Sequence, residues 1–161
     1  MANQRKRDQK TPRRQFAALP CMAGNTGLMV MLVTSRDTGR WVLLKEWPKK
    51  RLSGSELAAL EAFEEAGLEG EIASRAIGFY RYAKRMPNGR EITCDVNVYP
   101  MRLARELDDW PERAQRTRRW FTMTDAAAAV NEAELSMLLL GLVTDNDASP
   151  DRIHAHNRTM P

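Results

Sequence analysis

The sequence is poor in the two residues that most often bind zinc or link chains covalently. It holds 2 cysteines and 2 histidines among 161 residues. Cys21 and Cys94 lie in apolar, strand-like surroundings without a partner at metal-ligand spacing, so two buried thiols in a reducing compartment are favoured over a disulfide. His154 and His156 fall in a polar C-terminal segment, and we assign neither a catalytic role.

Long apolar runs are also missing. No run approaches the ~20 residues that a membrane-spanning helix needs. The apolar stretch 16–19 near the N-terminus is followed at once by Pro20, so it is too short to form the core of a signal peptide. We therefore expect no membrane contact and a cytoplasmic location.

The net charge of +4 is concentrated at one end of the chain. Residues 1–14 hold six basic side chains and one acidic one, whereas the other 147 residues hold 19 basic and 20 acidic groups. Such a basic arm could bind a phosphate backbone, but no base-reading motif accompanies it. A disordered, solubilising arm is the alternative, and a nucleic-acid partner is not expected.

Strand patterns dominate the chain. Apolar runs at 28–34 and 41–44 predict buried strands, and the residues around 15–22 have an extended pattern. Two long strands are expected at about 71–85 and 90–103, joined by a hairpin at 87–89. A short strand begins at Arg119.

Two helices complete the pattern. Good helix formers run from Ser55 to Ala66, with Ser53 or Ser55 as the cap and Gly67 at the end. A second helix spans 125–142, with a break near Asn131. We divide the chain into an arm (1–13), one domain (14–143) and a disordered tail (144–161). The expected fold class is α/β, with a mixed sheet and helices packed on its faces.

Three glutamates on the first helix form the candidate chemical feature. Glu61, Glu64 and Glu65 stand at i, i+3 and i+4, so they fall within one arc of the helix. Hard oxygen ligands at this spacing suit Mg²⁺ or Mn²⁺. An acidic, solvated helix face has the same spacing, and both interpretations stay open on spacing alone.

The stretch Glu61 to Leu68 resembles the end of the Nudix box, Glu-x-x-Glu-Glu-x-Gly-apolar. Matching segments in order resemble the bacterial branch related to diphosphoinositol polyphosphate phosphohydrolases: 17–19, 35–36, 40–41, 47–49, 78–82, 106–111 and 118–121. The resemblance covers about residues 13–142. It implies a Nudix-type α/β/α sandwich with a mixed central sheet.

The resemblance also implies an activity. Nudix enzymes cleave diphosphate linkages, so Glu61, Glu64 and Glu65 are the expected metal ligands and catalytic residues, with Mg²⁺ or Mn²⁺ as the cofactor. The expected substrate is a phosphorylated small molecule: a nucleoside diphosphate derivative, a dinucleoside polyphosphate or an inositol pyrophosphate. The protein would act as a monomer or homodimer. The positions expected to bind its phosphates are Arg14, Ser35, Arg36, Arg40, Arg116 and Arg118.

The box departs from its pattern at three places. Its first Gly falls on Glu46, its first Glu on Leu52 and its Arg on Leu60. In the family this Arg orients the next glutamate, here Glu61, and leucine can donate neither a hydrogen bond nor a charge. Two functions therefore compete: a slow or altered hydrolase, and a catalytically impaired module that binds a phosphorylated ligand.

Overall fold

The computed structural model describes residues 11–143, so most of the predicted arm and the tail from residue 144 lie outside the described residues. Strand β1 begins at Arg13, which the sequence analysis had assigned to the arm. The elements are β1 (Arg13–Gly24), β2 (Gly27–Thr34), β3 (Trp41–Val42), β4 (Leu44–Glu46), α2 (Gly54–Ala66), β5 (Leu68–Ile72), β6 (Gly78–Arg85), β7 (Glu91–Glu106), β8 (Arg118–Thr122), α3 (Met123–Ala129) and α4 (Ala133–Val143).

Strand β1 organises the sheet. It pairs antiparallel with β2 and β4 and parallel with β7, so the sheet is mixed, as predicted. Ala17 lies opposite Val98 of β7 on one side and Lys45 of β4 on the other. Strands β5 and β6 pair with β7, and β3 and β8 pair with β2.

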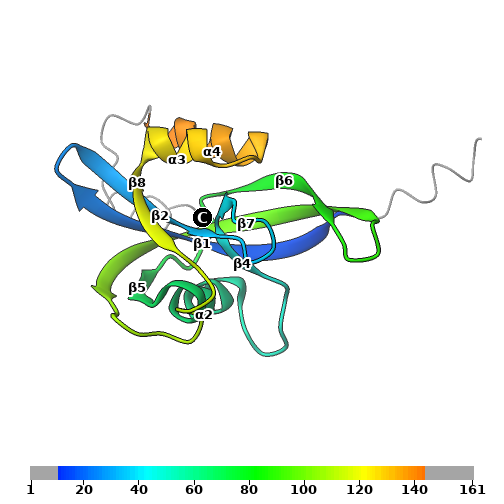
Figure 1. Ribbon diagram of the computed structural model, residues 1–161, viewed down its shortest axis with the longest axis horizontal. Helices are drawn as coiled ribbons and strands as arrows, with labels where there is room; N and C mark the ends of the chain where they lie inside the picture. The colour runs from blue at the N-terminus through cyan, green and yellow to red at the C-terminus, as the bar shows by residue number, and fades with distance from the viewer. Residues whose placement is uncertain (1–10, 144–161) are drawn as a thin grey trace, which may run out of the picture.

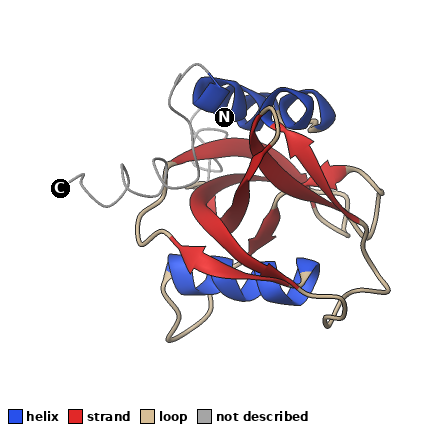
Figure 2. Cartoon of the chain, turned by 90° about the vertical axis from the view of Figure 1, so that its left-hand side faces the viewer, coloured by secondary structure: helices blue, strands red, loops and turns tan. Residues whose placement is uncertain are grey.

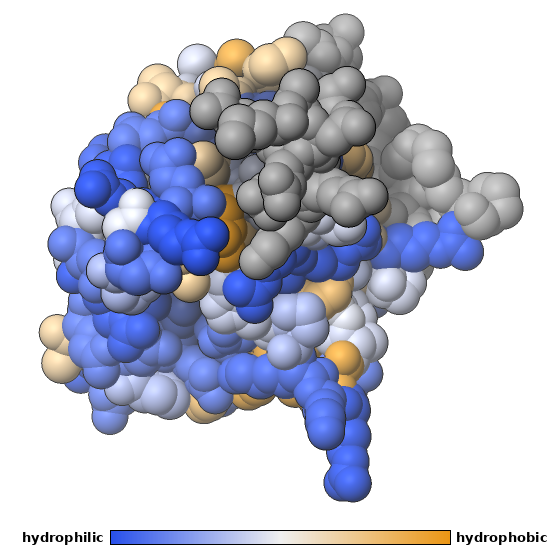
Figure 3. Space-filling model, turned by 90° about the vertical axis from the view of Figure 1, so that its right-hand side faces the viewer, coloured by the Kyte–Doolittle hydropathy of each residue, from blue (hydrophilic) through white to orange (hydrophobic). Residues whose placement is uncertain are grey.

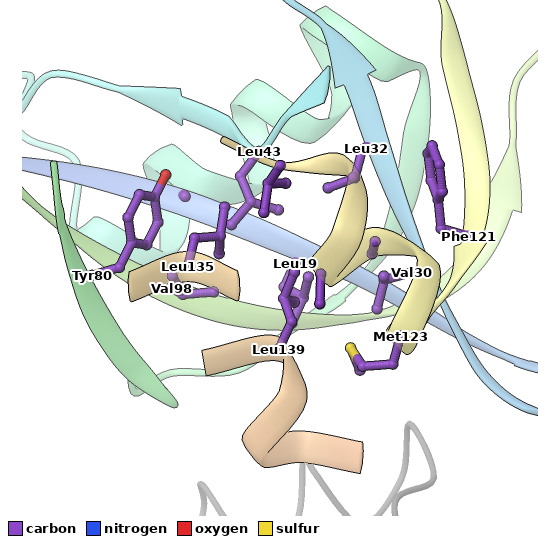
Figure 4. Packing of buried hydrophobic residues seen from close by; sticks show 14 of the residues in the cluster. Leu19, Val30, Leu32, Leu43, Tyr80, Val98, Phe121, Met123, Leu135 and Leu139 are labelled. Carbon is purple, nitrogen blue, oxygen red and sulfur yellow. The ribbon is translucent and has the colours of Figure 1, made fainter. Parts of the chain in front are cut away.

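Helices cover both faces of this sheet. Figures 1 and 2 show α3 and α4 on one side and α2 on the other. Successive residues of a strand point to opposite faces, so Leu19 packs in the core under α3 and α4, whereas Ala18 packs under α2. Figure 4 shows the first of these cores, in which Leu135 and Leu139 of α4 meet the strands. The predicted sandwich is confirmed.

The ends of α2 follow the predicted signals. Ser53 caps the first turn, where its hydroxyl accepts from the Glu56 N–H and the Glu56 carboxylate accepts from the Ser53 N–H. Gly67 ends the helix with φ 63° in the left-handed region. Both features fix the helix boundaries, because they satisfy backbone groups that a helix end leaves open.

The other expected elements form, except that the strand expected at 41–44 is divided between β3 and β4 and the one expected at 71–85 is also divided. The hairpin turns at Gly89 with φ 82°, and the second helix breaks into α3 and α4 around Asn131. The expected strand at 71–85 is wrong as a single element, because β5 ends at Ile72 and β6 starts at Gly78. Cys21 and Cys94 are both buried free thiols.

In the described residues, no helix combines the length and the apolar character needed to cross a bilayer. The face shown in Figure 3 is mainly hydrophilic, with small apolar areas between the charged ones.

Candidate functional site

The three glutamates on this arc of α2 differ in how deeply they are buried. Glu61 and Glu65 belong to the side that packs on the sheet, with exposed fractions of 2% and 7%, whereas Glu64 is half-buried. The solvated-face interpretation is therefore wrong for Glu61 and Glu65. A buried carboxyl group needs a compensating partner, so this pair is the first feature of the helix that stability alone does not explain.

The two buried carboxyl groups lie close enough together for each to shift the pKa of the other. Burial raises the pKa of Glu61 from 4.5 to about 8, and the carboxylates of Glu65 and Glu46 raise it further. Burial also raises the pKa of Glu65 to about 7, although the Arg116 guanidinium acts in the opposite direction. Burial thus moves the pKa of both carboxyl groups towards neutral pH, where a group can both accept and donate a proton.

Arg116, from the segment that precedes β8, holds the Glu65 carboxylate in position. Its guanidinium donates to the Glu65 carboxylate at 3.0 Å, to Glu112 at 3.1 Å and to the Thr34 carbonyl at 3.2 Å. Its side chain is only 9% exposed. Arg36 lies at the exposed edge of the same group, where it donates to Gln115 at 3.0 Å. The structure therefore brings Arg116 and Arg36 to the acidic helix.

Arg118 contacts the end of α2 instead. It donates to the carbonyls of Ala66 and Leu107, each at 2.7 Å, and its guanidinium lies 3.9 Å from the centre of the Trp110 ring. The Trp110 ring N–H donates to the Glu65 carbonyl at 3.0 Å. These contacts give Arg118 a positioning role at the helix end.

The segment between β7 and β8, together with Arg118 at the start of β8, binds carbonyls at the end of α2. The Glu64 carbonyl accepts from the Glu112 N–H at 3.0 Å, and the Gly67 carbonyl accepts from the Leu107 N–H at 2.8 Å. Gly67 also needs to be glycine for space, because a Cβ there would come within 2.7 Å of the Trp110 ring. The 107–118 segment is therefore joined to the acidic helix.

The remaining predicted phosphate-binding residues are not tied to α2 by any hydrogen bond among the described residues: Arg14, Ser35 and Arg40. Arg14 is exposed on β1, in register with Asp95 of β7. Ser35 and Arg40 close the turn between β2 and β3 through a backbone hydrogen bond of 2.7 Å. The Arg40 guanidinium donates within that turn, to Thr38.

The departures from the box have visible consequences. The Glu46 carboxylate accepts from the Trp47 N–H at 2.8 Å and lies 3.8 Å from the Lys49 ammonium. The same ammonium lies 3.9 Å from Oε1 of Glu61, an atom that has no hydrogen bond. Lys49 is thus a cation of the chain itself between two carboxylates, and the sequence analysis did not single it out.

The fit of a divalent cation can be judged on these positions. The donors are the hard carboxylate oxygens that Mg²⁺ prefers. Within residues 11–143, however, no three acidic, histidine or cysteine side chains converge closely enough to hold a metal ion. Glu61, Glu64 and Glu65 therefore have the right chemistry for a metal but not, as they stand, the right positions.

Comparisons with known proteins agree on the fold. No protein-family model matches the chain. It is 32% identical over 102 residues to Nudix hydrolase 12, mitochondrial, of Arabidopsis thaliana, which covers 62% of the chain and 50% of that relative. It is 27% identical over 130 residues to Nudix hydrolase 4 of the same plant, covering 77% and 61%. The chain thus spans about half the length of the curated relatives it matches.

Solved structures are similar to the chain in fold. A C. elegans Ap4A hydrolase binary complex aligns with a TM-score of 0.62 at 14% identity, over 82% of the chain and 96% of that structure. The NUDIX domain of Shewanella oneidensis NrtR, complexed with ADP ribose, aligns with a TM-score of 0.59 at 14% identity, over 80% and 85%. The chain therefore has the Nudix fold, and the curated relatives that it matches in sequence are Nudix hydrolases.

Proposed function

We propose that this chain is a hydrolase that cleaves the diphosphate linkage of a nucleoside diphosphate derivative or a dinucleoside polyphosphate. The observation that carries the proposal is the buried pair Glu61 and Glu65, in which the Glu65 carboxylate accepts a hydrogen bond from Arg116. A purely structural helix face rarely holds two desolvated carboxyls, because each costs stability. The names of the related proteins, which include an Ap4A hydrolase and an ADP-ribose complex, support this substrate class.

The proposed chemistry uses the proton capacity of the pair. A water molecule attacks one phosphorus of the diphosphate, its oxygen forms the new P–O bond, and the bond to the bridging oxygen breaks. Glu61, in its ionised form, accepts the proton of that water, and the electrons of the broken bond leave with the bridging oxygen. Arg116 keeps Glu65 oriented, and Arg36, whose side chain is 58% exposed, contacts an outer phosphate once it releases Gln115 and Glu112.

A divalent cation is part of the proposal as the family resemblance implies it, with Glu61, Glu64 and Glu65 as its ligands. When bound, such a cation neutralises charge on the diphosphate. For this the three carboxylates have to converge, and Lys49 has to move away from Glu61, since its ammonium is 3.9 Å from Oε1. We therefore expect metal binding to be weaker than an intact box would provide.

The test is a hydrolysis screen with Mg²⁺ and with Mn²⁺ over nucleoside diphosphate derivatives, dinucleoside polyphosphates and inositol pyrophosphates. We expect phosphate or nucleotide release that falls by ~10² or more in Glu61→Gln, as for loss of a general base, and that is also lost in Glu64→Gln. Glu91→Gln, an exposed change on β7, is the matched control. Equal inactivity of the wild type and Glu64→Gln across the panel contradicts the proposal.

A second function is favoured by one observation. Glu46 and Leu60 replace the box Gly and Arg, and Lys49 already compensates Glu46 and Glu61. These replacements suit a module that binds a phosphorylated ligand without cleaving it. Calorimetry would then show binding without product, and the double change Glu46→Gly with Leu60→Arg should create activity. Robust turnover by the wild type eliminates this alternative.

A further inference from the structure

Basic side chains collect at one end of the sheet, where β1 starts and where β6 and β7 form their hairpin. Residues 13–14 and 81–95 hold six basic side chains, and within these ranges only Glu91 and Asp95 carry the opposite charge. We call the six the basic sheet end: Arg13, Arg14, Arg81, Lys84, Arg85 and Arg90. All of them are exposed except Lys84, which is half-buried.

The strand register places the start of β1 beside the hairpin. Arg14 of β1 and Arg81 of β6 lie on either side of Asp95 of β7. The Arg81 guanidinium donates to both carboxylate oxygens of Asp95, at 2.8 and 3.1 Å. One carboxylate thus stands between two guanidinium groups, so this row of the sheet keeps a positive charge.

Most of the other charges of the basic sheet end are not compensated. Four of the six have no ion pair with any residue of 11–143: Arg14, Lys84, Arg85 and Arg90. The Arg13 guanidinium lies over the Trp47 ring, 4.7 Å from its centre, and keeps its charge. By contrast, Arg105 near the other end of β7 lies 3.0 Å from the Glu69 carboxylate. Uncompensated charges of one sign attract a polyanion.

The residues that precede β1 add to this charge. Residues 1–12 hold four basic side chains and one acidic one. Because a chain spans at most about 3.6 Å per residue, Lys10 is within about 11 Å of Arg13. Figure 1 shows the β6–β7 hairpin projecting on this side, and Figure 3, in which this side faces the viewer, shows it as mainly hydrophilic.

An exposed aromatic ring lies beside these cations. Phe79 is 61% exposed, and it precedes Arg81 on β6 by two residues, so both side chains share one face of the sheet. Phe79 lies opposite Asn97 of β7, and Asn97 lies opposite Phe16, which packs against the core under α2. The ring is therefore on the α2 side of the sheet. At this exposure it gives up most of the stability that burial of a phenylalanine provides.

We propose that the basic sheet end and Phe79 bind single-stranded nucleic acid. Cations that follow a phosphate backbone, together with a ring on which a base can stack, are the two parts of such a surface. Five of the six cations are arginines, whose planar guanidinium groups donate to two phosphate oxygens at once. An anionic membrane is favoured less, because membrane binding requires several apolar side chains, and Phe79 is the one large apolar side chain exposed on the described part of this surface.

A nucleic-acid partner was not expected from the sequence, because the residues after Arg14 carry 19 basic and 20 acidic groups. The fold separates these charges, since it gathers unpaired basic residues at the hairpin and acidic ones around α2. No residue of the acidic helix takes part in the proposed surface, so the inference stands apart from the proposed hydrolase.

Fluorescence anisotropy of the full chain tests the inference. The probes are labelled oligouridylate and oligothymidylate of about 12 nucleotides, within the usual size of such sites. They carry no terminal phosphate and are used in a chelating buffer, so hydrolysis of a diphosphate plays no part. We expect dissociation constants of about 10⁻⁶–10⁻⁴ M at physiological salt. Binding of either probe supports the inference, and tighter binding of the RNA shows that the 2′-hydroxyls are contacted.

The double change Arg85→Gln with Arg90→Gln removes two cations of the hairpin. It should weaken binding ~10-fold and make the slope of log Kd against log salt concentration shallower by about 1.4, since each phosphate contact contributes about 0.7. Arg105→Gln with Arg113→Gln is the matched control, because it removes the same charge from side chains that are 66% and 60% exposed outside the basic sheet end. Equal losses in the two double variants overturn the inference.

Phe79→Leu separates stacking from general apolar contact. It keeps an exposed apolar side chain, so the unfolding midpoint should not change, whereas binding should weaken ~10-fold because a base loses its stacking partner. Phe79→Trp should retain binding. The inference fails if neither oligonucleotide binds or if Phe79→Leu binds as the wild type does. Binding of phosphatidylglycerol vesicles without binding of either oligonucleotide overturns it in favour of a membrane surface.

Discussion

The buried acid pair makes an unusual pH dependence of stability the sharpest prediction. The pKa of Glu61 is raised from 4.5 to about 8 in the folded chain. Between these values the folded state binds more protons than the unfolded state, so stability falls as pH rises. The contribution is fully present below pH 4.5 and is lost as pH passes through about 8. Glu65, whose pKa is raised to about 7, acts in the same direction.

The magnitude follows from the size of the shift. One pKa unit corresponds to about 1.4 kcal/mol, so the Glu61 shift corresponds to on the order of 5 kcal/mol between pH 4.5 and pH 9. Glu61 is 2% exposed, so solvent screens this cost little. Most small domains are stable by only about 5–15 kcal/mol, which makes the effect a large share of the total.

The assay compares the wild type with Glu61→Gln by urea unfolding at pH 5, 7 and 9 in a chelating buffer. Glutamine mimics the protonated carboxyl, so the two proteins should be equally stable at pH 5, and the variant should be several kcal/mol more stable at pH 9. Glu91→Gln, which is exposed, should follow the wild type at every pH. A stability difference that is constant with pH refutes the reasoning.

Three further predictions concern the surroundings of the pair. Lys49→Gln should tighten Mn²⁺ binding, measured by paramagnetic resonance, because the Lys49 ammonium lies 3.9 Å from Oε1 of Glu61. The gain in affinity should be ~10-fold larger than that for the adjacent Lys50→Gln. Equal gains from the two changes contradict a local role of Lys49. Gly67→Ala should lower the free energy of unfolding by about 1–3 kcal/mol, since its Cβ would meet the Trp110 ring at 2.7 Å. Arg118→Ala should cost about 1–3 kcal/mol by leaving the carbonyls of Ala66 and Leu107 unpaired, and a smaller loss would show that water replaces the guanidinium.

The helix ends and turns could be predicted because their signals are local. Ser53 and Gly67 fix the ends of α2, and Gly89 fixes the hairpin. The division of 71–85 was missed because the connecting residues still bond to β7, where Ala73 donates to Pro100 and Ile77 donates to Val98. The apolar pattern of the segment therefore continues across a break in the strand.

The site was predicted only in part for a different reason. Spacing placed Glu61, Glu64 and Glu65 on one arc of a helix, but it does not say which part of that arc faces the sheet. Partners such as Arg116, 51 residues away in the sequence, depend on the tertiary fold.

The binding of the last α2 carbonyls by the 107–118 segment has a consequence for motion. Backbone amides of Leu107 and Glu112 donate to that helix end, as do the side chains of Trp110 and Arg118. A surface connection of this kind ordinarily exchanges its amide hydrogens quickly, but these two amides should exchange at the rate of the helix. The segment therefore cannot open as an independent lid over the acidic residues: any displacement of it would draw the end of the helix, and Glu65 with it, along the same path.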